Sequence, residues 1–341
     1  MKKGLVFSGG GMSIRQMVEI AQEAEAAGLD SIFVTEAWRS AFVPLTAIAM
    51  GTQRVELGTY IMNAYARSPW LAGMSAIDVD ELSGGRLVLG VGTGNKHINE
   101  EWQGVPQERP LRKMDEYVTL LKKIFATSVG EELRYEGEMH HMQWPPAVQP
   151  VRRDIPVYLA GLFPKMIKVA GRVADGLAMG ALLSPAYIRD HVMAQARQAA
   201  ADAGRDPAAL GSILAPFVAV ADTADQARQM AREAICHLYA PLPHPYYDFV
   251  IREQGFTKAA DAASKLVPEG KFQQATEAFT DDIIDVLTIS GTVEDCRAKL
   301  ADYDGVVDHM LFVNVNFSAG TAEQLMHTFR EMIKIGAAAH T

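Results

Sequence analysis

The sequence predicts a parallel (β/α)8 barrel, and three observations point to that fold class. Short β-rich runs alternate with helical patterns, and the alternation amounts to eight strand–helix units. A chain of 341 residues is long enough for one barrel of this kind with added segments. Its composition, 49% hydrophobic and 21% charged, is that of an ordinary folded protein. An open doubly wound parallel sheet is the alternative.

The first four expected strands are each followed by a helical pattern. Ser13 and Gln16 form a capping box at the start of the first helix, and Gly28 is placed to end it. After the third strand, Ser68 and Pro69 supply an N-cap followed by proline at the first helical position. The four strands are expected at 4–8, 31–35, 55–62 and 86–92.

Four more units follow after a pause in the rhythm. Ser184 with Pro185 starts one of their helices, and Thr321 with Gln324 caps the last one. The run 213–221 is interpreted as one long buried strand. The four strands are expected at 156–161, 177–180, 213–221 and 309–316.

Two segments interrupt the rhythm within what we expect to be one domain over 1–341. Segment 127–150, before the fifth strand, contains an expected hairpin around 134–142. Segment 236–290, between the seventh and eighth strands, is expected to be a helical insertion. Insertions of this size are often lids, so it is a candidate lid over a mixed aromatic pocket, with a packed surface excursion as the alternative. The side chains that suggest a lid are His237, Tyr239, His244, Tyr246 and Tyr247.

Charge and hydropathy exclude several classes of protein. The net charge of −9 argues against nucleic acid as a default partner, because phosphate binding needs clustered Lys and Arg. No apolar run approaches the roughly 20 residues of a membrane span, and the start at Met1 lacks the apolar segment of an export signal. Cys236 and Cys296 are too few for a disulfide framework. We therefore expect a cytoplasmic protein with neither a nucleic acid nor a membrane as partner.

In a barrel, chemistry belongs at the C-terminal ends of the strands. Glycine-rich turns follow two of them, at 8–11 and 90–94, but neither is a GxGxxG motif, because Ile14 and His97 occupy the third glycine positions. Such turns still let a flat or anionic ligand approach the backbone. The alternative is that they are turns that only need positive φ.

A more specific pattern runs from Gly161 to Lys165. A strand ending in glycine, followed by a helix N-terminus with a lysine in its first turn, predicts an anion site, with a solvated surface lysine as the alternative. Glu36 follows the second strand and could act as acid, base or hydrogen-bond acceptor; an exposed ion pair with Arg39 is the alternative. The histidines show no HxH or HExxH spacing, so no metal site is expected.

Longer phrases carry a family resemblance. The stretch LGTYIMNAYARSP at 57–69, followed by DELSGGRLVLGVGTG at 80–94, resembles the bacterial luciferase-like family. The sequence is most similar to the branch that uses the deazaflavin coenzyme F420, which includes methylenetetrahydromethanopterin reductase and F420-dependent glucose-6-phosphate dehydrogenase. EWQGVP at 101–106 and GLFPKM at 161–166 extend the resemblance over nearly the whole chain.

The resemblance implies a barrel that binds F420 or FMN at the C-terminal ends of its strands. It also implies a bulged third strand with a non-prolyl cis peptide, which here would join Tyr60 and Ile61. Phosphate contacts would fall in the predicted anion site, and Glu36 would lie near the ring. The cofactor-binding residues expected in this way are Ser8, Gly9, Glu36, Tyr60, Ile61, Asn63, Thr93, Gly94, Asn95, Gly161, Phe163 and Lys165.

Two departures from the family pattern bear on the reaction. Many F420-dependent members have histidine where this chain has Ala37, and the sugar-phosphate dehydrogenase has a catalytic glutamate where this chain has Asn95. The sugar-phosphate reaction is therefore not expected. The candidate catalytic residues are Glu36, Asn95 and His97, with Glu100 as a further acid or base.

The leading hypothesis is an oxidoreductase that transfers hydride between bound F420 and an organic small molecule. One alternative is an FMN-dependent monooxygenase of a two-component system, supplied by a separate flavin reductase. Another is a flavin-binding protein without turnover. A metal-dependent barrel hydrolase fits poorly, because the strand ends lack the necessary ligands. The resemblance also implies a homodimer.

Overall fold

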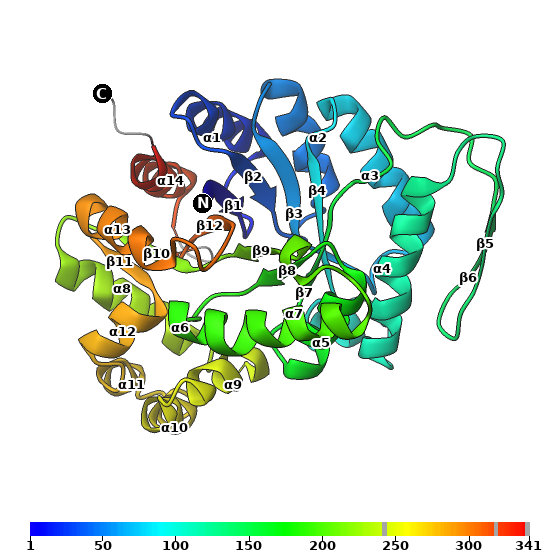
Figure 1. Ribbon diagram of the computed structural model, residues 1–341. Helices are drawn as coiled ribbons and strands as arrows, with labels where there is room; N and C mark the ends of the chain where they lie inside the picture. The colour runs from blue at the N-terminus through cyan, green and yellow to red at the C-terminus, as the bar shows by residue number, and fades with distance from the viewer. Residues whose placement is uncertain (241–243, 317–319, 338–341) are drawn as a thin grey trace.

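Eight parallel strands form a closed barrel in the computed structural model, which describes residues 1–240, 244–316 and 320–337 (Figure 1). Each strand is hydrogen-bonded to the next, and the last pairs with the first through registers such as Leu5 with Phe312. The closed barrel is therefore confirmed over the open sheet. Its strands are β1 (Lys2–Phe7), β2 (Ser31–Val34), β3 (Glu56–Asn63), β4 (Leu87–Gly92), β7 (Val157–Ala160), β8 (Gly176–Met179), β9 (Gly211–Leu214) and β12 (His309–Asn314).

Helices surround the barrel, and their starts match the predicted signals. Ser13 and Gln16 form a capping box, and Ser68 caps the helix that begins at Pro69. In the described part of the chain no helix is both long and apolar enough to cross a membrane. The main helices are α1 (Ile14–Ala26), α2 (Phe42–Gly51), α3 (Pro69–Ser83), α4 (Pro110–Ala126), α5 (Pro164–Val173), α7 (Ala194–Asp202), α8 (Ala224–His237), α13 (Val293–Leu300) and α14 (Ala322–Gly336).

The core has two parts, one inside the barrel and one between the strands and the helices. The inner part is small and holds side chains such as Val6, Phe33 and Leu311. Near the N-terminal ends of the strands it also contains a polar pair, in which Ser31 Oγ lies 2.6 Å from His309 Nε2. Both side chains are buried, so this pair belongs to the barrel interior rather than to the predicted site.

The expectation of one long strand over 213–221 is wrong. The run is broken at Pro216, and strand β10 (Phe217–Val220) follows the break. Proline has no N–H to donate, and the Pro216 carbonyl accepts a bond from Val313 N where β9 ends and β10 begins. β9 therefore pairs with the start of β12, and β10 pairs with its end.

The segment 236–290 is mainly helical, as expected, but a short strand begins at its end. Strand β11 (Ile289–Gly291) ends the segment and pairs in parallel with β10, outside the closed barrel. With only three residues, it has no periodicity that a sequence pattern could reveal. Residues 241–243 of the expected insertion lie outside the described residues. Its helices are α9 (Pro245–Glu253), α10 (Thr257–Leu266), α11 (Phe272–Glu277) and α12 (Asp281–Leu287).

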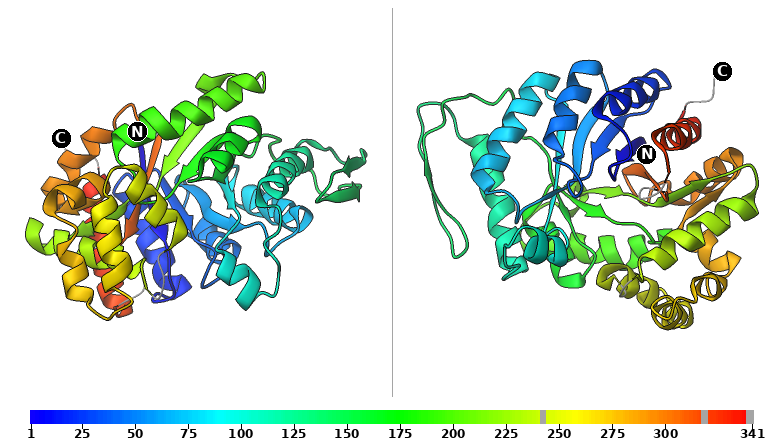
Figure 2. Two further views of the ribbon diagram at one scale, coloured as in Figure 1. Left: turned by 90° about the horizontal axis from the view of Figure 1, so that it is seen from below. Right: turned by 180° about the vertical axis from the view of Figure 1, so that it is seen from behind.

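Within 127–150 the chain forms an antiparallel hairpin of β5 (Leu133–Glu136) and β6 (His141–Trp144). The hairpin projects from the barrel beside α4 in both views (Figures 1 and 2). Its turn is held by the buried Glu116 carboxylate, which accepts three backbone N–H bonds from residues 138–140 at 2.9–3.0 Å. The hairpin is thereby tied to α4 and lies away from the strand ends.

Candidate functional site

The C-terminal ends of the barrel strands bring together segments that are far apart in the sequence. The turns after β1, β2, β4 and β7 open on this face, which we call the mouth. Ser8, Glu36, Asn95 and Gly161 are among the predicted site residues that follow those four strands.

Glu36 is held in an ion pair inside the protein. Its carboxylate accepts bonds from Arg67 Nη2 at 2.8 Å and Arg67 Nε at 3.2 Å, and both side chains are mostly buried. It also accepts the Asn63 backbone N–H at 3.2 Å. The alternative of an exposed pair with Arg39 is wrong, because Arg39 donates instead to the carbonyl oxygens of Gly10 and Met12. Glu36 therefore acts as a fixed anion that positions β3.

Asn63 holds the turn after β4 in place. Its Nδ2 donates to Asn99 Oδ1 at 2.7 Å, and Asn99 donates to the Thr93 carbonyl at 2.7 Å. Gly94 sits against Asn63 with a φ of +65°, and an added Cβ would lie 2.5 Å from Asn63 Nδ2. Asn99 could not be predicted as a site residue, because it lies in a short π-helix, Ile98–Trp102, with no spacing signal of its own.

The third strand is bulged, as the resemblance implies. The register between β3 and β4 shifts between Thr59 and Met62, and the peptide bond joining Tyr60 to Ile61 is cis. The Tyr60 hydroxyl crosses the barrel and donates to the Met179 carbonyl at 2.5 Å. Burial raises the pKa of this phenol well above its ordinary value. Tyr60 is therefore a neutral hydrogen-bond donor.

Asn95 links the turn after β4 to the insertion. Its Oδ1 accepts the His97 backbone N–H at 2.8 Å, and its Nδ2 lies 3.3 Å from His244 Nε2. The His97 ring is exposed and lies beside Trp102, 6.2 Å between ring centres. Asn95 therefore faces the insertion, whereas the His97 side chain lies on the outer rim.

Aromatic side chains from the start of α9 cover part of the mouth. Phe163, which follows β7, lies 5.3 Å from Tyr246 and 4.8 Å from Phe249 between ring centres. Tyr247 lies near Phe217 on β10, at 6.3 Å. The residues 244–249 therefore do not form a surface excursion but pack on the strand ends.

Two residues of the predicted lid lie elsewhere. Tyr239 is fully buried, and His237 packs against Phe272 of α11 at 4.7 Å between ring centres. Both belong to the packing between α8 and the insertion. Of the five side chains that suggested a lid, those of His244, Tyr246 and Tyr247 are therefore the ones that lie over the strand ends.

Helix α5 begins at Pro164, inside the predicted anion motif. The backbone N–H groups of Met166 and Ile167 return to the Phe163 carbonyl, and the first turn contains no acidic residue. Lys165 is exposed there and forms no ion pair with any described residue. Gly161 is close-packed, since an added Cβ would lie 3.2 Å from Ile167 N. The turn offers a helix N-terminus and one cation.

Several buried polar atoms at the mouth lack partners. Nine buried side-chain atoms of the described residues have no hydrogen-bond partner, and four of them lie at the mouth: Ser8 Oγ, Arg39 Nε, Asn314 Nδ2 and His244 Nδ1. Ser8 and Asn314 line a common cavity of about 10 Å³, together with Gly9 and apolar side chains that include Met17 of α1 and Phe329 of α14. Buried polar groups are normally satisfied, so unpartnered groups gathered at one face are what a ligand site requires.

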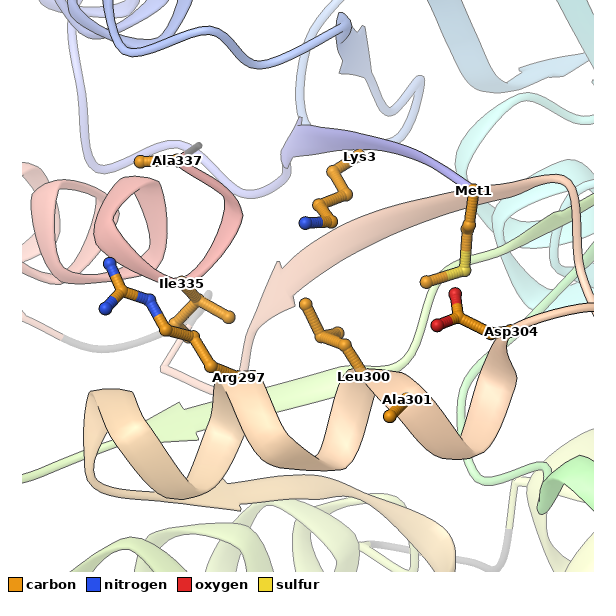
Figure 3. Close-up of a pocket in the computed structure, with 8 residues that line it drawn as sticks. All are labelled: Met1, Lys3, Arg297, Leu300, Ala301, Asp304, Ile335 and Ala337. Atoms are coloured by element: carbon orange, nitrogen blue, oxygen red, sulfur yellow. The ribbon is translucent and has the colours of Figure 1, made fainter. Parts of the chain in front are cut away.

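Two other kinds of site, a metal centre and a second cavity, would be alternative locations for the function of the protein. No group of three or more His, Cys, Asp or Glu side chains in the described chain is placed to hold a metal ion. A larger cavity of about 300 Å³ lies at the opposite end of the barrel, where Met1 and Lys3 line it together with Leu300 and Asp304 (Figure 3). None of the predicted site residues lines it.

The sequence profile of the family described as luciferase-like monooxygenase matches residues 3–310. A candidate coenzyme F420-dependent oxidoreductase of Mycobacterium tuberculosis is 29% identical, over 95% of this chain and 97% of that protein. The 5,10-methylenetetrahydromethanopterin reductase of Methanolobus tindarius is 28% identical, over 84% and 86%.

Among solved structures, the coenzyme F420-dependent tetrahydromethanopterin reductase of Methanopyrus kandleri superposes with a TM-score of 0.78. The match covers 97% of each chain at 20% identity and shows that the two proteins share a fold. Because the family profile spans most of the chain, the chain belongs to the luciferase-like monooxygenase family and is an oxidoreductase of that family.

Proposed function

We propose that this protein uses coenzyme F420 to transfer hydride to or from an organic small molecule at the mouth of the barrel. The observation that carries the proposal is the group of buried, unpartnered polar atoms at the mouth, on Ser8, Arg39, Asn314 and His244. Relatives of nearly full length that are named for F420-dependent reactions favour F420 over FMN.

The residues at the mouth fit a deazaflavin with an anionic tail. The N-terminus of α5 and Lys165 would receive the negative charge of the tail. The bulged strand around Tyr60 and Ile61, braced by the Glu36–Arg67 ion pair, would support the ring. Gly9, Thr93, Gly94 and Asn95 would border it. When bound, the coenzyme supplies the two-electron hydride chemistry.

The protein itself would position the groups at the mouth and exclude water from the reacting atoms. Arg67 holds the Glu36 carboxylate in position, and Glu36 in turn holds the Asn63 backbone. The aromatic side chains of α9 cover the strand ends and would keep water from the reacting atoms. The exposed His97 would meet ligands only at the rim. We do not assign it a proton-transfer role.

We also propose that the protein is a homodimer, formed through α2 and α3. These adjacent helices leave large apolar side chains in solvent: Val43 is 59% exposed, Met50 67% and Trp70 43%. A patch of this kind usually marks a protein interface. Because it lies on the outside of the barrel, a second copy would cover it without closing the mouth.

The proposed cofactor is tested by equilibrium binding of F420 and FMN, each oxidised and reduced, without oxygen. We expect F420 to bind at least about tenfold more tightly than FMN. Lys165→Ala should weaken F420 binding about tenfold, because a charge-assisted bond is lost. Lys168→Ala, in the second turn of α5, is the matched control and should bind as the wild type does. Preference for reduced FMN would contradict the proposal and indicate a two-component monooxygenase.

A further inference from the structure

The insertion contributes a histidine whose protonation pattern follows from its neighbours. The His97 backbone N–H donates to Asn95 Oδ1 at 2.8 Å, which fixes the orientation of the Asn95 amide. Asn95 Nδ2 therefore faces His244 Nε2, 3.3 Å away. An amide NH₂ group can only donate, so His244 Nε2 must accept.

This arrangement determines the tautomer of His244. With Nε2 as an acceptor, the proton of the neutral ring is carried by Nδ1. Burial lowers the pKa of His244, which favours the neutral ring. The ring packs against Tyr246 at 5.2 Å and Tyr247 at 4.9 Å between centres, and neither ring brings a charge close to it.

The proton on Nδ1 has no acceptor. Nδ1 is buried and has no hydrogen-bond partner in the described protein. Leaving a buried donor unpaired is unfavourable, so such a group indicates an acceptor that arrives with a ligand. Three other unpartnered atoms at the mouth, Ser8 Oγ, Arg39 Nε and Asn314 Nδ2, belong to the strand ends, whereas His244 Nδ1 belongs to the insertion that covers them.

We propose that the Nδ1–H of His244 recognises a carbonyl oxygen of the organic substrate, and so selects substrates that carry an oxygen acceptor at the reacting end. This inference rests on the proposed function for the presence of a substrate at the mouth. His244 is then a specificity-determining donor, and Asn95 is the positioning residue that keeps its proton on Nδ1.

The first test measures the tautomer without any coenzyme. Long-range proton–nitrogen spectra of the full chain labelled with ¹⁵N-histidine should show a neutral, Nδ1-protonated ring near neutral pH. The signal is assigned by its loss in His244→Gln. Asn95→Ala should release the preference for this tautomer. An Nε2-protonated or charged ring in the wild type would overturn the inference.

The second test compares two probes of equal shape, acetophenone and α-methylstyrene, which differ only in whether they carry the carbonyl oxygen. The wild type should bind acetophenone about tenfold more tightly. His244→Asn, which keeps a donor near the Nδ1 position, should retain much of this preference. His244→Gln, which keeps an acceptor for Asn95 but lacks the Nδ1–H, should lose it.

Every outcome of these two tests either supports or overturns the role assigned to His244. Equal binding of the two probes by the wild type, no binding of either, or a preference that survives in His244→Gln would overturn the assignment. Repeating both tests with oxidised F420 present separates the two sources of a carbonyl. If F420 alone shifts the Nδ1–H signal and abolishes the preference, the donor serves the coenzyme and the substrate assignment fails. If F420 does not bind but the tautomer and probe preference hold, the proposed function fails by itself.

Discussion

Glu36 and Arg67 form a two-point ion pair beneath the mouth of the barrel, with Oε1 2.8 Å from Nη2 and 3.2 Å from Nε. The guanidinium also lies 5.1 Å above the ring of Phe42. The pair joins the end of β2 to the turn after β3, and Glu36 Oε1 also accepts the Ala41 backbone N–H at 3.4 Å. Glu36, a predicted catalytic residue, is therefore held in place by Arg67 and braces the end of β3.

This bracing role predicts how a substitution of Glu36 should change the stability of the protein. Glu36→Gln removes the charge but keeps most of the shape, so Arg67 is left without its counter-ion. We expect the free energy of unfolding to fall by about 1–3 kcal/mol, measured by urea denaturation. Because Glu36 also holds the Asn63 backbone, F420 affinity should fall as well. Unchanged stability with lost turnover would instead favour a direct catalytic role.

A substitution of Gly94 tests whether the turn after β4 must pack closely against Asn63. Gly94→Ala places a Cβ 2.5 Å from Asn63 Nδ2 in a backbone with φ of +65°, so both strain and a clash are introduced. We expect a loss of at least about 2 kcal/mol of stability and weaker coenzyme binding. Gly104→Ala is the matched control, since its φ is +66° and its Cβ would meet nothing within 4 Å. Equal losses in the two variants would show that φ alone matters.

His309 predicts a pH dependence of stability. Burial, assisted by Lys2, lowers its pKa from 6.5 to about 3 in the folded protein. The unfolded chain therefore binds a proton below pH 6.5 that the folded chain does not, and stability should fall as pH drops from 6.5 towards 3. The slope from this group is about 1.4 kcal/mol per pH unit.

Replacing His309 checks the assignment. His309→Gln should remove this contribution to the pH dependence of the free energy of unfolding between pH 6.5 and pH 3, measured by chemical denaturation across that range. Ser31, its partner at 2.6 Å, provides a control: Ser31→Ala removes the bond but leaves the buried imidazole, so the slope should persist. If the slope is unchanged in His309→Gln, the pH dependence of stability comes from other titrating groups.

The exposed faces of α2 and α3 predict the oligomeric state. The wild type should sediment as a dimer, and replacing both Val43 and Met50 with glutamate should shift it to monomer. Val148 and Val151, 49% and 56% exposed near the hairpin, provide a matched double replacement that should remain dimeric. A monomeric wild type would contradict the proposed interface.

Local interactions let the sequence alone predict much of the barrel. The capping box of Ser13 and Gln16 and the Ser68–Pro69 start depend on residues three positions apart or fewer, so their patterns are visible without a structure. The eight-unit rhythm likewise follows from helical and strand periodicity. Because parallel strands end at one face, the rhythm also indicated where the site lies.

Tertiary packing decided the roles of the side chains at that site. Glu36 has Arg39 three positions away but pairs with Arg67, 31 positions away, because the bulged end of β3 brings that guanidinium to it. The bond from Asn95 to His244 spans 149 positions and depends on where the insertion packs. Which side chains form ion pairs, and which buried donors stay unpaired, depends on how segments distant in sequence pack together. No local sequence pattern contains that information.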